Sequence, residues 1–545
     1  MAYTAHVDTF ARDRLPPREL WPELVFDLPE LRYPERLNCA AELLDKAVER
    51  GWGDRPCLLT PDGIRWTYAD LREKADRIAA VLVEDLGVVP GNRVLLRAAN
   101  HPMMVACWFA VIKVGAIAVA TMPLLRAREL AQIVTKAEVS HALCDHRLLD
   151  ELRGAQSQAP VLRHIVPFNA PGEGLDAMMA GKSGTFPTIE TAAEDTCLIA
   201  FTSGTTGEPK GCMHVHRDVM AITDCFPPHV LKATPDDLFT GSPPLAFTFG
   251  LGGLVLFPMR IGAATLLLER APPDVLAEAI ARHRATVCFT APTAWRAFVE
   301  LADKYDLKCL RRCVSAGETL PQATWEAFHR RTGLRIIDGI GATEMLHIFI
   351  SASDDDIRPG TTGKAVPGYQ ARIIGPDGRT LPPGEIGRLA VIGPTGCRYL
   401  ADERQRTYVQ GGWNVTGDAY RMDADGYFHF QGRADDMIIS AGYNIAGPEV
   451  EDALLTHPLV RECGVVGASD PERGTIVKAY VVLAEGTLRN ETTVKALQDH
   501  VKRIIAPYKY PRAITFVDTL PRTETGKLQR YKLREIEQGR QSVPS

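Results

Sequence analysis

The sequence predicts a mixed α/β fold that is large enough for more than one domain. Its 545 residues exceed the usual length of a single domain. Strand-like and helix-like segments alternate along most of the chain, which is typical of βαβ units around a largely parallel sheet. From Gly363 the pattern changes to short strands between glycine and proline turns, which predicts a small β-rich subdomain up to about residue 430. After Arg433 strands and helices alternate again for about 110 residues, the length of one small domain.

Each element is predicted from a local pattern. Residues 67–85 have the spacing of an amphipathic helix, with Thr67 as a plausible cap. Apolar runs bounded by turn residues predict the other elements. They are strands at 93–97, 116–122, 142–145, 197–201, 264–268 and 287–290, and helices at 102–113 and 274–283.

One apolar stretch, residues 103–125, has nearly the length of a membrane span. It contains Lys113 and is broken by Gly115 and Pro123, so a buried helix followed by a core strand is the better interpretation. The net charge is −5 and no basic block is present, which argues against a nucleic acid or an anionic membrane as partner. The N-terminus has no cationic segment followed by an apolar one, so no secretory signal is evident.

The twelve cysteines are scattered, and most lie in apolar runs. Only Cys309 and Cys313 are close together, and no second pair completes a zinc set. Reduced core cysteines are typical of a cytoplasmic protein, which we expect to be a monomer or a homodimer. The pair His214 and His216 could suggest a metal, but a role in local structure is favoured because the pair lies at an expected helix start.

The most specific segment is the loop at 201–211, with the sequence FTSGTTGEPKG. It follows a buried strand and offers hydroxyls, unhindered backbone N–H groups and one lysine, a combination that fits a polyphosphate. The spacing is not that of a Walker A loop or of a dinucleotide fingerprint. A surface turn rich in glycine is the alternative, but the ordered string is too specific to favour it.

This loop resembles the phosphate loop of the acyl-adenylate-forming superfamily, which includes acyl-CoA synthetases, amino-acid adenylation domains and luciferases. Four further segments resemble motifs of that superfamily and follow in the same order. They are the adenylate-binding segment IDGIGATE at 337–344, the ribose-binding VTGD at 415–418, the hinge GRADDMI at 432–438 and the C-terminal catalytic loop PRTETGK at 521–527. The chain is therefore identified as a member of this superfamily. The resemblance implies a large N-terminal domain at 1–434 and a small mobile lid domain at 435–545, with Asp435 as the hinge.

The reaction implied is activation of a carboxylate by ATP to an acyl-adenylate, for which developing charge must be held by cations and aimed donors. The resemblance assigns Thr343 to the α-phosphate, Glu344 to Mg²⁺ and Lys527 to the bridge between the incoming carboxylate and the α-phosphate. A solvated surface lysine is the alternative for Lys527, but its motif argues against it. The β- and γ-phosphates would be held by the loop residues Thr202, Ser203, Gly204, Thr205, Thr206 and Lys210.

The same resemblance implies sites for the rest of ATP and for coenzyme A. Asp418 would accept hydrogen bonds from the ribose hydroxyls, with support from Arg433. The adenine pocket would be lined by Gly317, Glu318, Asp338, Gly339 and Ile340, where the aliphatic Ile340 replaces the more usual tyrosine. The pantetheine tunnel would be lined by Gly442 and Tyr443. Lys509 and Arg512 could meet the phosphates of coenzyme A, or could be solvated charges.

The acyl pocket resembles that of the aryl-CoA ligase branch, closest to the 2-aminobenzoate-CoA and benzoate-CoA ligases. The implied pocket residues are Phe247, Thr248, Phe249, Gly341, Ala342 and His347. No aspartate lies between Pro243 and Gly253, so an α-amino acid is disfavoured. Thr248 and His347 could meet an ortho substituent of the ring, or could satisfy each other.

The expected activity is therefore an AMP-forming ligation of an aromatic acid, 2-aminobenzoate, to coenzyme A. Benzoate or salicylate as the acid and a carrier protein as the acceptor are the alternatives. A nucleotide-binding protein that has lost the chemistry is a further alternative, disfavoured by the intact motifs around Glu344 and Lys527.

Overall fold

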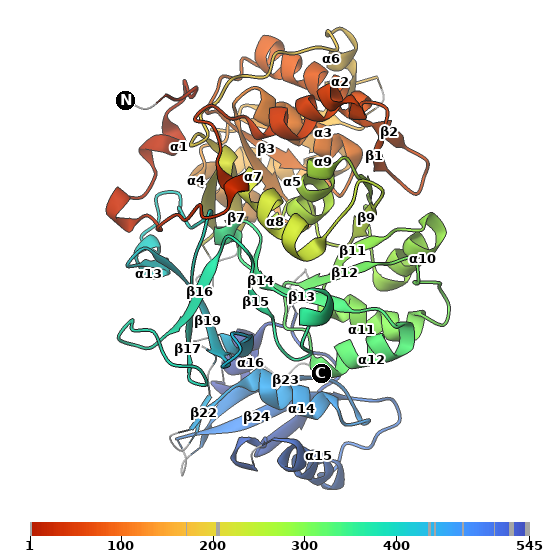
Figure 1. Ribbon diagram of the computed structural model, residues 1–545, viewed down its shortest axis with the longest axis vertical. Helices are drawn as coiled ribbons and strands as arrows, with labels where there is room; N and C mark the ends of the chain where they lie inside the picture. The colour runs from red at the N-terminus through yellow and green to blue at the C-terminus, as the bar shows by residue number, and fades with distance from the viewer. Residues whose placement is uncertain are drawn as a thin grey trace.

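The computed structural model describes most of the chain. The described residues are 3–170, 172–202, 208–433, 436, 438–440, 443–470, 474–505, 507–522 and 528–539. Ser203, Gly204, Thr205, Thr206, Asp435, Gly442 and Lys527 lie outside them. Within the described residues, the chain forms two large sheets with helices around them, a smaller β-rich sheet and a separate C-terminal α/β unit (Figure 1).

The first large sheet has six strands in the order β6-β5-β3-β4-β7-β8. All neighbours are parallel except β7 and β8, which form an antiparallel pair. The strands are β3 (Arg93–Arg97), β4 (Ile117–Thr121), β5 (His141–Asp145), β6 (His164–Phe168), β7 (Thr196–Thr202) and β8 (Lys210–Val215). The strands expected at 93–97, 116–122, 142–145 and 197–201 are confirmed to within one residue at each end.

The second large sheet has nine strands in the order β15-β14-β13-β12-β11-β9-β10-β1-β2, parallel in its centre and antiparallel at both edges. Its strands are β1 (Pro56–Leu59), β2 (Arg65–Thr67), β9 (Leu238–Gly241), β10 (Ala264–Leu266), β11 (Val287–Thr290), β12 (Arg312–Ala316), β13 (Ile336–Gly341), β14 (Ile348–Ser351) and β15 (Lys364–Ala365). The ends of β12 and β13 carry the segments at 315–318 and 337–344, so the sheet brings two predicted parts of the site side by side.

Helices around the two sheets bury apolar faces in the core. Those of ten residues or more are α2 (Tyr68–Ala80), α3 (Pro102–Lys113), α4 (Ala127–Lys136), α5 (Leu149–Gln158), α7 (His216–Phe226), α10 (Pro273–His283), α11 (Pro292–Leu301) and α12 (Gln322–Thr332). Thr67 caps α2 as expected, since its hydroxyl accepts from the Asp70 N–H at 3.1 Å and the Asp70 carboxylate accepts from the Thr67 N–H. The predicted helix at 67–85 is regular only to Ala80, and Val81–Asp85 continues it as a π-helical turn.

The apolar stretch at 103–125 forms the buried helix α3 and the core strand β4, as predicted. Every residue of α3 is buried, including Lys113. The Lys113 ammonium lies 2.5 Å from Asp45 and 2.6 Å from Asp76, so this buried charge is paired on both sides. Among the described residues, no helix combines the length and the apolarity needed to cross a bilayer.

The predicted β-rich subdomain is present, but it begins at Gln370 rather than at Gly363, because β15 (Lys364–Ala365) joins the second large sheet. Its sheet has the order β16-β17-β19-β18, and β20 pairs with β19. The strands are β16 (Gln370–Ile374), β17 (Ile386–Ile392), β18 (Val409–Gln410), β19 (Trp413–Met422) and β20 (Phe428–Arg433). Asp418 and Arg433 are cross-strand partners in β19 and β20, so the register of this sheet sets the predicted ribose site.

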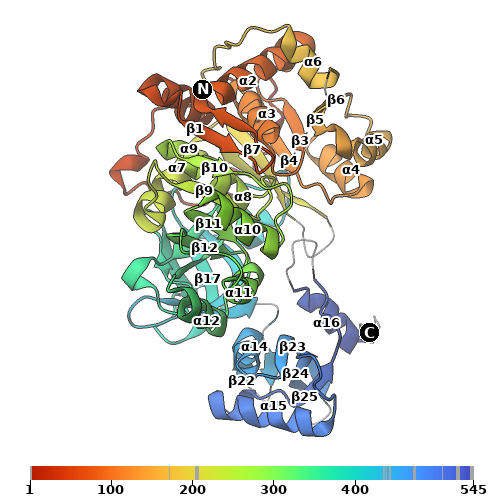
Figure 2. The ribbon, with the colours of Figure 1, turned by 90° about the vertical axis from the view of Figure 1, so that its right-hand side faces the viewer.

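The C-terminal part has its own hydrophobic clusters, separate from those of the large sheets. It consists of the hairpin β21 (Ile438–Ser440) and β22 (Tyr443–Ile445), the sheet β23 (Val460–Asp470), β24 (Gly474–Leu483) and β25 (Ala513–Phe516), and the helices α14 (Gly447–Leu455), α15 (Glu491–Ile504) and α16 (Arg530–Glu537). Figure 2 shows it at the bottom of the molecule, beyond the two large sheets. This arrangement agrees with the expected large N-terminal domain and smaller C-terminal domain.

Candidate active site

The phosphate-binding loop predicted at 201–211 connects the two antiparallel strands β7 and β8. Thr202 at the end of β7 and Lys210 at the start of β8 are direct cross-strand partners. The hairpin therefore places a hydroxyl and an ammonium at the two sides of the base of the loop. Two other segments, the β13–β14 turn and residues 397–400, contact β8 beside this base.

Glu344, the predicted metal ligand, is buried in the turn Thr343–Met345 between β13 and β14. Its Oε1 accepts a hydrogen bond of 2.5 Å from the Tyr399 hydroxyl and lies 3.4 Å from the Lys210 ammonium. Lys210 in turn donates to the Tyr399 hydroxyl at 2.9 Å. Within the described part of the chain only Oε1 of Glu344 is hydrogen-bonded, so Oε2 is the oxygen available to a hard cation such as Mg²⁺.

Thr343, the predicted ligand of the α-phosphate, is held through its backbone. The Nε2–H of His214 donates to the Thr343 carbonyl at 2.7 Å. Behind it, Asp218 is fully buried and lies 3.6 Å from the other ring nitrogen of His214. Although burial would raise the pKa of Asp218, the adjacent Arg398 guanidinium lowers it to about 2. The role in local structure expected for His214 is therefore confirmed, and the structure extends it to the turn of Thr343.

The turn that carries Thr343 and Glu344 ends in an unusual backbone conformation. Leu346 has a φ of 69°, which is rare for a residue with a branched side chain. The side chain is fully buried, so the surrounding core holds this conformation in place. Strained residues of this kind cluster at functional sites, where they fix the direction of neighbouring side chains.

At the predicted ribose site, the carboxylate of Asp418 contacts the guanidinium of Arg433. Arg433 donates from Nη1 to Asp418 Oδ1 at 2.8 Å across the β19–β20 pair. Burial raises the pKa of Asp418, while Arg433 opposes this effect. Gly417 has a φ of 77°, and a side chain there would also lie 3.0 Å from Arg433. Both constraints explain why glycine precedes the aspartate.

The predicted adenine residues lie at the ends of β12 and β13. Gly317 follows β12 with a φ of 93°, and Asp338 pairs with Ser315 in the sheet. Burial raises the pKa of Asp338, whose Oδ1 has no hydrogen-bond partner among the described residues. Gly339 is enclosed, because a Cβ there would lie 2.8 Å from the Ile348 side chain.

A cavity of about 350 Å³ opens beside Asp338, between the second large sheet and the C-terminal part. Thr319 and Asp338 line one side, and Glu449, Asp452 and Lys509 line the other. Lys509, which could meet a phosphate of coenzyme A, here donates to both carboxylate oxygens of Glu449 at 2.6 Å. The cavity has the size of a small-molecule site and is next to the predicted adenine residues.

The predicted acyl residues come from two segments that are brought together in the core. Phe247 precedes the short helix α8 (Thr248–Leu251), while Gly341, Ala342 and His347 flank the turn of Glu344. Phe249, Ile340 and Ala342 are half-buried and pack against one continuous hydrophobic cluster. Asn100 fixes the loop before α8, since it donates to the Pro243 carbonyl at 3.0 Å and accepts from the Leu245 N–H at 2.8 Å.

His347 lies inside a cage of aromatic rings. The centroid of its imidazole is 4.5 Å from Phe257, 5.7 Å from Phe226, 5.8 Å from Phe249 and 6.4 Å from Phe289. Gly252 leaves room for the ring, because a Cβ there would approach His347 Cδ2 to 2.4 Å. Neither nitrogen has a hydrogen-bond partner among the described residues, so Thr248 and His347 do not satisfy each other. Burial lowers the pKa of His347 to about 3 against a smaller opposing effect of the Phe249 backbone, so the imidazole stays neutral.

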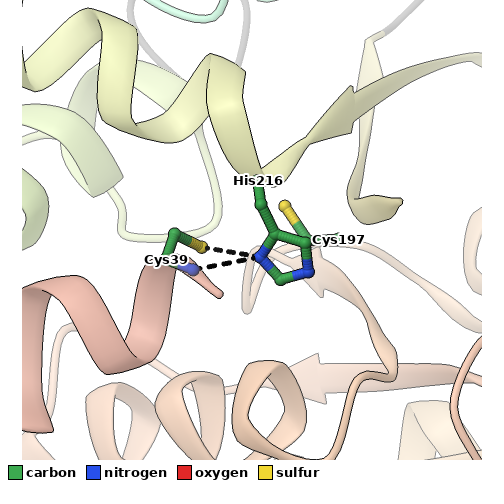
Figure 3. Close-up of side chains that lie close together, drawn as sticks. All are labelled: Cys39, Cys197 and His216. Atoms are coloured by element: carbon green, nitrogen blue, oxygen red, sulfur yellow. Dashed lines mark hydrogen bonds between the residues drawn. The ribbon is translucent and has the colours of Figure 1, made fainter. Parts of the chain in front are cut away.

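A second cluster of polar groups lies away from this site. Cys39, Cys197 and His216 are fully buried, and one ligand atom from each lies within 4.8 Å of the others (Figure 3). The Nδ1 lone pair of His216 accepts from the Cys39 N–H at 3.1 Å and contacts the Cys39 thiol at 3.3 Å. The Cys197 thiol donates to the His214 carbonyl at 3.6 Å, and Nε2 of His216 has no hydrogen-bond partner among the described residues. All twelve cysteines are free and eleven are buried, as expected for core residues.

Three residues that shape the site do not stand out in the sequence: Tyr399, Asn100 and Gly252. Tyr399 lies 55 positions from Glu344 and 189 from Lys210, so no local pattern joins them. Asn100 and Gly252 likewise contact residues that are distant in the sequence, Leu245 and His347 respectively. The only signal in the sequence is that an asparagine and a glycine interrupt otherwise apolar runs. The roles predicted for the residues outside the described ranges stay predictions. Tyr443, expected to line the pantetheine tunnel, is the first residue of β22.

Comparison with known proteins covers most of the chain. Residues 44–399 match the family described as AMP-binding enzyme, and residues 449–527 match the AMP-binding enzyme C-terminal domain. Benzoate–CoA ligase of Thauera aromatica is 35% identical over 513 residues, which are 93% of this chain and 97% of that protein. A 4-hydroxybenzoate–CoA/benzoate–CoA ligase of Rhodopseudomonas palustris is 32% identical, with 92% and 94% covered.

Solved structures agree with these relatives. The crystal structure of the anthranilate CoA ligase AuaEII in complex with anthranoyl-AMP superposes with a TM-score of 0.88 at 35% identity, and 94% of this chain and 99% of that chain are covered. A benzoate CoA ligase from Burkholderia xenovorans LB400 gives a TM-score of 0.83 at 30% identity, with 92% and 100% covered. Because the family match spans more than half of the sequence and the relatives align over nearly all of it, the chain belongs to the AMP-binding enzymes and is an acid–thiol ligase of that family.

Proposed function

We propose that this protein is an AMP-forming ligase that joins an aromatic carboxylic acid, 2-aminobenzoate, to coenzyme A at the expense of ATP. The acid attacks the α-phosphorus of ATP, pyrophosphate leaves, and the resulting acyl-adenylate then reacts with the thiol of coenzyme A, which releases AMP. The proposal is supported by the relatives, whose names are those of benzoate and anthranilate CoA ligases. It is also supported by the contacts between residues that the sequence predicts for each part of ATP.

In the first half-reaction the chain must bind ATP and hold the negative charge of the phosphates. Thr202 and Lys210 lie at the base of the phosphate loop, and the Thr343 turn faces the same point. Glu344 would hold Mg²⁺ through Oε2, and a bound Mg²⁺ supplies neutralisation of phosphate charge. Asp418 and Arg433 would bind the ribose, and Asp338 lies beside the cavity that could take the adenine.

Lys527 would stabilise the first transition state by bridging the carboxylate and the α-phosphate. A lysine that acts only there must be delivered by a domain that can also withdraw it, which fits a lid at 435–545 that moves on a hinge at Asp435. After that movement, Gly442 and Tyr443 would line the path of the pantetheine arm. We also propose that the enzyme works in the cytoplasm as a monomer or homodimer, which fits its buried free cysteines.

The observation that carries the choice of acid is the unpaired imidazole of His347 in its aromatic cage. A buried polar group without a partner destabilises a protein by about 1–3 kcal/mol, so such groups persist where a ligand satisfies them. The ring of an aromatic acid would pack on Phe249 and Ile340, and an ortho amine would then reach His347 or Thr248. This neutral hydrogen bond would favour 2-aminobenzoate over benzoate by only about two- to tenfold.

The test is a comparison of kcat/KM for 2-aminobenzoate, salicylate, benzoate and a straight-chain fatty acid, measured as aryl-CoA formation. We expect 2-aminobenzoate first, benzoate next and the fatty acid negligible. Thr248→Val keeps the shape of the side chain and removes its hydroxyl, so it should narrow the gap if Thr248 is the partner of the amine. A tenfold or greater preference for benzoate would make the protein a benzoate-CoA ligase instead.

A further inference from the structure

We propose that Tyr399 is a positioning residue for ATP and its cation, because its hydroxyl is hydrogen-bonded to both Glu344 and Lys210 and fixes the direction of the two side chains. The inference rests on the proposed roles of those two residues as ligands of Mg²⁺ and of the phosphates. Tyr399 itself need not touch either group. It acts through the two charged side chains that its hydroxyl contacts.

The geometry of the hydroxyl allows one hydrogen-bond pattern. A tyrosine hydroxyl has one proton to donate and accepts through its lone pairs. A carboxylate can only accept and an ammonium can only donate, so the proton must point to Glu344 while Lys210 donates to the oxygen. The distances are 2.5 Å to Glu344 and 2.9 Å from Lys210.

The position of the Tyr399 ring is fixed from several directions. Its side chain is fully buried in a small cluster with Cys212, Cys397 and Val409. Its backbone forms an antiparallel bridge with Cys212 in β8, the strand that Lys210 begins. The N–H of Tyr399 donates to the Gln405 side chain at 2.9 Å. The hydroxyl is therefore anchored to the same strand as one of its two partners.

The consequence concerns the direct attraction between Lys210 and Glu344. Their charged atoms form a long ion pair of 3.4 Å, and the Tyr399 hydroxyl is the nearer partner of both. Without the hydroxyl each side chain would be the main partner of the other, and a tighter ion pair would have to open before they could bind phosphate and cation. The hydroxyl satisfies Oε1 of Glu344 and leaves Oε2 for the cation, so it prepares both ligands before ATP arrives.

The experiment compares Tyr399→Phe with a matched control, Tyr408→Phe. Tyr408 stacks edge-on against Tyr399 with ring centroids 5.8 Å apart, and its buried hydroxyl has no hydrogen-bond partner among the described residues. Each variant loses one buried hydroxyl from the same pair of rings. The primary measurement is binding of MgATP by calorimetry in the absence of any acid, and the second is the KM for ATP against the KM for the acid.

We expect Tyr399→Phe to weaken MgATP binding about tenfold, the lower end for loss of a hydrogen bond to a charged group. Its KM for ATP should rise with the KM for the acid unchanged, and Tyr408→Phe should match the wild type. A double variant with Glu344→Gln should bind MgATP little worse than Glu344→Gln alone, because both changes act on one contact. Unchanged binding in Tyr399→Phe, an equal loss in Tyr408→Phe, or additive losses in the double variant would each overturn the proposal.

The calorimetric measurement needs no substrate acid. A protein that ligates no aromatic acid would contradict the proposed function, yet MgATP binding by Tyr399→Phe would still test the role of Tyr399. If instead aryl-CoA formation is found but Tyr399→Phe and Tyr408→Phe both bind MgATP as the wild type does, the proposed function stands and the role of Tyr399 is refuted.

Discussion

Replacement of His347 by leucine should make the protein more resistant to acid while it impairs recognition of the ortho substituent. The imidazole is buried among four aromatic rings and its pKa is lowered from 6.5 to about 3 by burial. Since the folded-state pKa lies below the unfolded one, the unfolded chain binds a proton that the folded chain rejects. The penalty on folding is absent well above pH 6.5 and grows as the pH falls from 6.5 towards 3.

The size of the effect follows from the two pKa values. At pH 5 the unfolded imidazole is mostly protonated and the folded one is neutral, which lowers the stability of the wild type by about 2 kcal/mol. At pH 7.5 this contribution vanishes. There the gain from removing unpaired nitrogens, about 1–3 kcal/mol, is opposed by lost aromatic contacts of about 0.5–1.5 kcal/mol. His347→Leu should therefore be no less stable than the wild type at pH 7.5 and clearly more stable at pH 5.

The measurement is the apparent melting temperature of wild type and variant at matched scan rate from pH 7.5 to pH 5. The difference between the two should widen by about 2 °C as the pH falls, since an unfolding entropy of about 2.1 cal/mol/K per residue makes roughly 1 kcal/mol correspond to about 1 °C in a chain of this length. His146→Leu, at a histidine that is 43% exposed, is the control and should show no such widening. A difference that stays constant with pH, or that shrinks on acidification, would refute the account of His347 as a buried neutral imidazole.

Three other substitutions test separate parts of the site. Lys527→Ala should nearly abolish adenylation, with a loss of about 2.7–4 kcal/mol in transition-state stabilisation, and spare thioester formation from supplied acyl-adenylate; equal damage in single-turnover assays of both steps would contradict its role. Asp435→Pro should keep pyrophosphate release if the first lid position tolerates the fixed φ, but block transfer to coenzyme A; a wild-type rate of aryl-CoA formation would place the hinge elsewhere. Gly252→Ala should push a Cβ into His347, destabilise the fold by about 1–3 kcal/mol and raise the KM for the aromatic acid; an unchanged melting temperature and KM would show that the imidazole moves freely.

The parts of the fold that could be predicted from sequence are those set by short-range patterns. Buried parallel strands are continuous apolar runs, and the bounds of Val287–Thr290 are predicted to the residue. The strands expected at 116–122 and 264–268 are too long by one residue at each end and by two residues at the C-terminal end, respectively. The cap at Thr67 is likewise a local signal, because the hydroxyl, the N3 carboxylate and the helix start lie within four residues. The π-helical turn at Val81–Asp85 was not predicted, since its sequence has the same spacing as the helix before it.

The residues of the site also fall into those predicted from local motifs and those that only the tertiary structure reveals. Glu344, Asp418 and Lys210 were predicted because each lies in a contiguous motif whose residues act together. The contacts of Tyr399 with Glu344 and of His214 with Thr343 are not predicted, because they join residues 55 and 129 positions apart in the chain. The motif residues are the ones expected to bind the ligand, whereas the residues that hold them come from β8 and from the segment around Tyr399. Only the tertiary structure reveals that these segments meet.

His347 shows why a polar residue at odds with its surroundings is informative. Four aromatic rings, Gly252 and the strained turn at Leu346 surround the imidazole. A leucine or phenylalanine would fill such a core without leaving a nitrogen unpaired. A residue that breaks the rule for its environment, with neighbours shaped to accept it, has a reason outside the free energy of folding. Recognition of a polar group on an aromatic substrate is such a reason. This reason also predicts that substitutions at position 347 which raise the stability of the fold lower the selectivity for an ortho-substituted acid. A variant of His347 selected only for resistance to acid should therefore lose the preference for 2-aminobenzoate over benzoate.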